Sequence, residues 1–121
     1  MAYQNILIKI FSLDTNNLLM KKEITTIELF IIGAVKSKRK ELSVNPSKLA
    51  LEIGLNRNFI RRIESLDYNE KYTFNQLNEI AKVLKCKIAD FLPDPYLEED
   101  CLEEYHVIRE ERLKKLRNQK K

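Results

Sequence analysis

The sequence predicts an all-α fold, and two observations indicate it. Between residues 25 and 93, apolar residues recur at the three- and four-residue spacing of amphipathic helices, and helix-capping residues precede these patterns. No strand is needed to account for this region. We therefore expect five short helices over residues 25–93, an extension over residues 1–24 ahead of them, and a charged amphipathic helix over residues 94–121 behind them.

Composition and charge narrow the class of protein. The chain has 121 residues, a net charge of +4 and a pI of about 9.0, which suits one domain with an anionic partner. The excess of positive charge is concentrated in residues 25–65, which include eight basic and four acidic residues. No apolar run approaches the roughly 18 residues of a membrane span, and we expect no signal peptide. Cys86 and Cys101 lack CxxC spacing, which favours reduced thiols and a cytoplasmic protein.

The extension over residues 1–24 contains two short apolar runs, "NILIKIFSL" and "LLMKKEI". The turn-type cluster "DTNN" separates them. This pattern is typical of a β-hairpin, and a loosely docked arm accounts for it equally well.

Each of the first four expected helices has a polar residue at its start. The predicted caps are Thr26, Asn45, Asn56 and Thr73, in chain order. Pro46 follows the second cap at the first helical position, where a missing N–H group costs nothing. The fifth helix, "KIADFL", should end before Pro93.

The second and third helices are joined by "GLN", a three-residue turn that contains Gly54. Such a turn is the local signature of a helix-turn-helix motif. A left-handed backbone at Gly54 would make the sharp corner without a Cβ clash.

The third helix, about residues 57–65, has two different faces. On a helical wheel Ile60 and Ile63 fall on one side and should face the core. The other side carries three arginines, an amide and a hydroxyl without any acid: Arg57, Asn58, Arg61, Arg62 and Ser65. Arginine offers a planar fork that matches guanine O6/N7 or phosphate oxygens, so this helix could lie in a DNA major groove.

With these features the chain resembles the Cro/XRE-type, phage-repressor-like family of helix-turn-helix DNA-binding domains. The resemblance includes "VKSKRKELSVNPSKLALEIGLNRNFIRRIES" and "LNEIAKVLKCKIADFL" and covers about residues 27–93. It implies a compact five-helix domain that binds operator DNA, usually as a dimer.

The resemblance also implies roles for single residues. It places Arg57, Asn58 and Arg62 at base edges and Asn56 at the groove edge, and it makes Arg39 and Glu64 a buried ion pair. We expect further contacts to the DNA backbone or groove edge from Arg61, Ser65, Lys36, Lys38 and Lys71.

Three positions depart from the family pattern. Pro46 stands where the family commonly has a phosphate-gripping Gln, so one backbone contact should be missing. Leu66 stands where Gly is favoured after the third helix, so the loop "LDYNEKYT" should be rearranged. Phe59 replaces a small polar residue, and it either packs inward, which we favour, or meets a thymine methyl group.

The C-terminal helix has an apolar stripe within half of its circumference, formed by Leu97, Cys101, Leu102, Tyr105, Ile108, Leu113 and Leu116. The stripe either docks on its own domain or pairs with the same helix of a second copy. Acids precede bases along this helix, so a pair should be antiparallel.

We expect a sequence-specific transcriptional regulator that binds double-stranded DNA as a homodimer, with no cofactor, metal or catalytic residue. An antitoxin or restriction-controller repressor of the same fold is an alternative role. A protein-interaction module that has lost DNA binding is an alternative of a different class, favoured by Pro46 alone.

Overall fold

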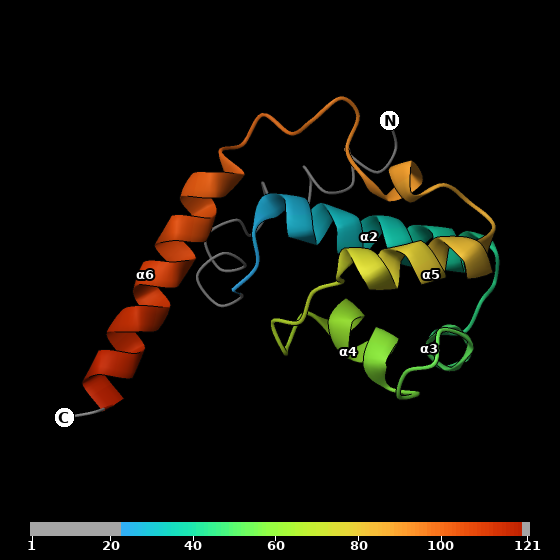
Figure 1. Cartoon of the computed structure of the whole chain (residues 1–121), viewed down its shortest axis with the longest axis horizontal. Helices are drawn as coiled ribbons and strands as arrows, with labels where there is room; N and C mark the ends of the chain where they lie inside the picture. Colours follow the sequence, from blue (N-terminus) through green and yellow to red (C-terminus); the bar gives the residue numbers. More distant parts are fainter. Residues whose placement is uncertain (1–22, 120–121) are drawn as a thin grey trace.

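The computed structural model describes residues 23–119, and every regular element within them is helical. The elements are α2 (Thr26–Glu41), α3 (Pro46–Glu52), α4 (Phe59–Ser65), α5 (Phe74–Leu84), the short 3-10 helix η1 (Ile88–Phe91) and α6 (Cys101–Gln119) (Figure 1). The predicted all-α fold is confirmed. The hairpin or arm expected at the N-terminus falls on residues 1–22, outside the described residues.

One apolar core joins the first five elements. α4 packs against α3 and α2, while η1 packs against α2 and α5. The buried side chains of this core are Phe30, Ala34, Val35, Leu49, Ala50, Ile60, Leu77, Ile80, Ala81, Leu84 and Phe91. Because both helices of the turn motif contribute to it, their mutual angle is set by packing as well as by the turn.

Two of the predicted helix starts are confirmed. Asn45 accepts a hydrogen bond from the backbone N–H of Ser47 at 2.8 Å, and Pro46 is the first residue of α3. Thr73 and Gln76 form a reciprocal capping box at the start of α5. These caps satisfy backbone donors that have no partner within the helix.

The predicted cap of the first long helix is wrong by one residue. Thr25, not Thr26, is the cap of α2, because Glu28 stands three residues after it and completes a capping box. The hydroxyl and the N–H of Thr26 instead donate to the carboxylate of Glu104, so that α6 meets the N-terminal end of α2.

Two predicted helices differ in extent from the observed ones. The third begins at Phe59 and not at Arg57, and the predicted cap at Asn56 is wrong: Asn58 holds the cap position, while the side chain of Asn56 accepts from the N–H of Asn58 and its carbonyl from the N–H of Phe59. The fifth is a single 3-10 turn over Ile88–Phe91. Both segments still supply the core residues expected of them.

The C-terminal helix is also shorter than predicted. It begins at Cys101 and not at residue 94, since proline cannot continue a helix and Pro93 and Pro95 lie in the non-helical segment before it. Asp100 accepts from the N–H of Glu103 at 3.0 Å and starts the helix. Leu97, expected in the stripe of this helix, packs against the main core instead.

α6 stands apart from the rest of the fold (Figure 1). None of its described residues is buried, and polar bonds join it to the rest of the fold: Glu104 accepts from Thr26, and Arg112 donates to Glu23 at 3.1 Å. No helix within residues 23–119 combines the length and the apolar character that crossing a bilayer requires.

The corner between α3 and α4 depends on backbone conformation. Gly54 has φ +78°, and the N–H groups of Gly54 and Leu55 return to the carbonyls of Leu51 and Ala50. A Cβ atom at Gly54 would meet nothing within 4 Å. The glycine is therefore required by its left-handed backbone and not by crowding.

This distinction gives a testable expectation for stability. Gly54→Ala should lower the free energy of unfolding by about 1 kcal/mol, since Ala is strained at positive φ but restricts the unfolded chain. Lys85, exposed at φ +54°, is the matched control. Lys85→Gly should raise stability, by about 0.5–1 kcal/mol. Urea unfolding of both variants measures the two effects, and an unchanged midpoint for Gly54→Ala would contradict the backbone argument.

Candidate nucleic-acid interface

The buried side of α4 fixes what its other side presents. Ile60 and Ile63 are fully buried against α2 and α3, as predicted. Phe59 is partly buried, packs against the core and meets the ring of Tyr72 edge-on at a centroid distance of 6.2 Å. This packing bears out the inward orientation favoured for Phe59.

The opposite side of α4 and the turn before it form an exposed face, which we call the arginine face. Its exposed members are Asn56, Arg57, Asn58, Arg61 and Ser65. It contains no acid. Arg57 and Arg61 form no ion pair with any other residue in the described range 23–119. Their guanidinium groups therefore have donors available for an anionic partner.

Arg62 differs from these two arginines because it has a partner. Its Nε lies 2.9 Å from Oε1 of Glu70 and its Nη2 lies 3.3 Å from Oε2, so the pair is bidentate. Both side chains are about one third exposed, at 37% and 32%. An ion pair in this setting contributes little to stability, but it fixes the orientation of the guanidinium plane.

Arg39 and Glu64 lie together beneath the arginine face. Nε and Nη2 of Arg39 donate to the two carboxylate oxygens of Glu64 at 2.8 and 2.7 Å, and Nη1 donates to the carbonyl of Val44 at 2.9 Å. Each side chain is only 8% exposed. The pair therefore ties the end of α2 to α4, and no acid of α4 points to the solvent on the arginine face.

Other residues predicted at the interface have internal partners. Ser65 donates its hydroxyl to the carbonyl of Arg62 at 2.7 Å. Lys71 pairs with Glu28 at 3.0 Å, at the N-terminal end of α2. For Ser65 and Lys71 to contact phosphates as predicted, each would have to give up its internal partner.

Two lysines of α2 were also predicted near phosphates. Lys38 pairs with Glu41 at 3.7 Å, and its charge also acts on the thiol of Cys86, which places it on the side of α2 near the end of α5. Burial nevertheless raises the pKa of Cys86. Lys36 is half-buried on the same helix.

Tyr72 closes the interior beside the ion pair. Its hydroxyl is buried and has no hydrogen-bond partner within the described part of the chain. Burial raises the pKa of Tyr72 far above its ordinary value, and the charge of Glu64 raises it further while that of Arg39 lowers it. Burial therefore favours the neutral form of the phenol.

The departures at Pro46 and Leu66 have visible consequences. Pro46 has no N–H, and the N–H of Ser47 is bound by Asn45, so the start of α3 offers few donors to a phosphate. Leu66 adopts the left-handed conformation at φ +64° that Gly would take without strain. The loop after α4 therefore keeps a tight start despite the substitution.

No sequence pattern indicates that Glu70 belongs to this surface. It lies eight residues after Arg62, beyond a left-handed turn, and no local spacing rule connects the two. An acid in the loop directly after an arginine-rich helix is the one signal that could have drawn attention to it.

Comparison with known proteins identifies the domain. A family model for the Cro/C1-type HTH DNA-binding domain matches residues 35–95, half of the chain. The match begins within α2 and includes α3, α4, α5 and η1. A comparison with curated proteins found no match, and a comparison with solved structures found none.

Proposed function

Because the chain belongs to the Cro/C1-type helix-turn-helix DNA-binding family, we propose that it is a sequence-specific transcriptional regulator whose α4 enters the DNA major groove. The family is one of DNA-binding regulators and not of enzymes. The observation that carries the proposal is the arginine face: an exposed, acid-free surface on the second helix of the turn motif, with Arg57 and Arg61 unpaired among the described residues.

The chemistry of each position supports a division of roles. Arg57 and Asn58 stand in the turn that leads into α4, where side chains can reach base edges first. Arg62 lies one turn further on and is the third base-reading residue. We assign Asn56 and Arg61 to phosphate oxygens, contacts that position the protein without specifying sequence.

We further infer that the regulator is a homodimer through α6. Four large apolar side chains of α6 are exposed along one side of the helix: Leu102, Tyr105, Leu113 and Leu116. The first turn is acidic and the last turns are basic. An antiparallel second copy of α6 would cover the apolar side and would set each acidic start against a basic end.

Salt dependence provides the first test. The affinity for duplex DNA should fall steeply with salt, because phosphate contacts release counterions. A dimer that neutralises about six phosphates should lose roughly 10³-fold in affinity between about 50 and 200 mM salt. Fluorescence anisotropy with a labelled random-sequence duplex measures this, and selection from a random duplex library then yields the preferred site.

Single variants sharpen the test. Arg61→Ala should weaken binding to all sequences alike and reduce the salt slope by about one. Lys82→Ala, which removes an exposed cation on α5, should leave the DNA affinity and the salt slope unchanged. If the affinity of the wild-type protein for duplex DNA did not depend on salt, the result would contradict DNA binding. The protein-interaction module would then be the remaining candidate function.

A further inference from the structure

Glu70 contacts a side chain of the proposed DNA-binding surface, Arg62, and an acid in this position is unexpected for a nucleic-acid-binding protein. A carboxylate beside a groove repels phosphates and lowers affinity for every DNA sequence. Yet Glu70 forms two contacts, of 2.9 and 3.3 Å, to a single base-reading candidate, Arg62. The contact to Arg62 therefore suggests that Glu70 has a role that compensates for its repulsion of DNA phosphates.

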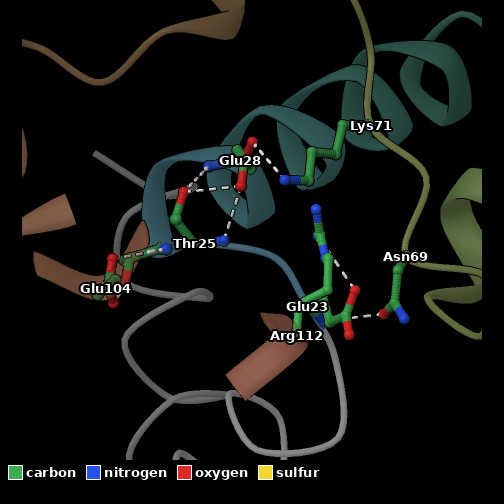
Figure 2. A network of polar contacts seen from close by, with 8 residues as sticks. Glu23, Thr25, Glu28, Asn69, Lys71, Glu104 and Arg112 are labelled. Atoms are coloured by element: carbon green, nitrogen blue, oxygen red, sulfur yellow. Dashed lines mark hydrogen bonds and ion pairs between the residues drawn. The ribbon is translucent and has the colours of Figure 1, made fainter. Parts of the chain in front are cut away.

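The backbone around Glu70 is anchored on both sides. Asn69 accepts a hydrogen bond from the N–H of Glu23 at 2.9 Å, and Lys71 pairs with Glu28 at 3.0 Å. Figure 2 shows both contacts at the N-terminal end of α2. Tyr72 then enters the interior. The carboxylate of Glu70 therefore projects from a fixed backbone and not from a free loop.

The contact geometry determines which donors of Arg62 stay available. Glu70 occupies Nε and the adjacent N–H of Nη2, which form one edge of the guanidinium group. The outer fork, formed by Nη1 and the second N–H of Nη2, has no contact to Glu70. Two N–H groups in this arrangement match the O6 and N7 acceptors of guanine. The pair thus leaves intact the part of Arg62 that can read a base.

We propose that Glu70 is a positioning residue that holds Arg62 so that its outer fork reads one guanine in each half-site, raising base selectivity while lowering general DNA affinity. This inference rests on the proposed function of α4 and adds a determinant of specificity outside that helix. Fixing the guanidinium before binding reduces the rotamer entropy that is lost on contact with DNA. It also disfavours the other side-chain rotamers by which a free arginine would reach different bases or phosphates.

The experiment compares five full-length proteins: the wild type, Arg62→Ala, Glu70→Gln, Glu70→Asp and Glu79→Gln. Glu79 is an exposed acid of α5 that pairs with Lys82, so its variant controls for the loss of one negative charge. A random-sequence duplex library gives the preferred site of the wild type, and the base pair whose preference disappears in Arg62→Ala identifies the position read by Arg62. Affinities are then measured for the selected site, for its three substitutions at that position and for a random-sequence duplex.

The wild type should prefer one base at this position by roughly tenfold or more. In Glu70→Gln that preference should fall to about threefold or less, while binding to the random duplex tightens by about two- to fivefold. Glu70→Asp keeps the charge but shortens the side chain, so its preference should fall without any gain in random-duplex affinity. Glu79→Gln should match the wild type in both measurements.

Two results would overturn the proposal. An undiminished preference in both Glu70 variants would mean that Arg62 is positioned without Glu70. A preference that sharpens in Glu70→Gln would mean that Glu70 holds Arg62 away from the DNA. Failure of the proposed function is distinguishable from both, because the wild type itself would then select no site and show no salt dependence.

Discussion

Glu64→Gln is expected to lower the free energy of unfolding by roughly 3–5 kcal/mol, which is a large share of the total stability of a small domain. The reason is burial. Arg39 and Glu64 are each 8% exposed and are joined by two short contacts. Replacing the carboxylate by an amide leaves the guanidinium charge buried without its counter-charge, while the volume of the side chain hardly changes.

A double-mutant cycle tests whether this cost belongs to the pair. Arg39→Met should also destabilise, since it strands the carboxylate and removes the bond to the carbonyl of Val44. The double variant should be less destabilised than the sum of the single variants, because each single variant already loses the shared interaction. Urea unfolding with a common m-value gives the three free energies. Strictly additive losses would show that the two residues do not interact.

An ion pair on α2 whose carboxylate is exposed supplies the control. Lys38 and Glu41 lie 3.7 Å apart, and the side chain of Glu41 is 57% exposed. Glu41→Gln should change stability by no more than about 0.5 kcal/mol, because water screens the interaction. A comparable loss in both variants would point to the net charge of the chain and not to burial.

The features that the sequence predicted well are those that local physics determines. Asn45 with Pro46, and Thr73 with Gln76, satisfy the donors of their own helices whatever the rest of the chain does. The three-residue period of Ile60 and Ile63 likewise determines which side of α4 faces inward. The arginine face is the opposite side of the same helix. Once the buried side of α4 was predicted, the position of the candidate site was therefore predicted as well.

The errors arise where one residue competes with its neighbour or where proline intervenes. Two threonines stand together at the start of α2, and only the position of Glu28 selects Thr25 as the cap. The apolar stripe and the charge order suggested a helix over residues 94–121, but the segment that contains Pro93 and Pro95 is not helical, and α6 begins at Cys101. Local propensity predicts that such elements exist more reliably than it predicts their ends.

The partners of the site residues could not be predicted from spacing. Glu70 reaches Arg62 only because Leu66 turns the chain back and because Asn69 and Lys71 fasten the loop to α2. These contacts depend on tertiary structure. The same holds for the bonds between Glu104 and Thr26, which dock α6 through polar groups while Leu102, Tyr105, Leu113 and Leu116 of its apolar stripe stay exposed.

That exposed stripe gives the second large expected effect. Leu116→Asp should raise the dissociation constant of the dimer by roughly a hundredfold or more, since it places a charge within the apolar contact of each copy. Affinity for a duplex with two half-sites should fall by about 10²-fold or more as well, because linking two domains makes the second contact intramolecular. Analytical ultracentrifugation and anisotropy measure the two effects.

Val107 provides a matched control for Leu116. It is 53% exposed against 50% for Leu116, and it lies on the opposite side of α6 from the apolar stripe. Val107→Asp therefore introduces the same charge into the same helix but should leave the dimer intact. Equal weakening by both variants would indicate a loss of helix stability and not of an interface. A monomeric wild type at about 100 μM, well above a typical dissociation constant for a biological dimer, would contradict pairing through α6.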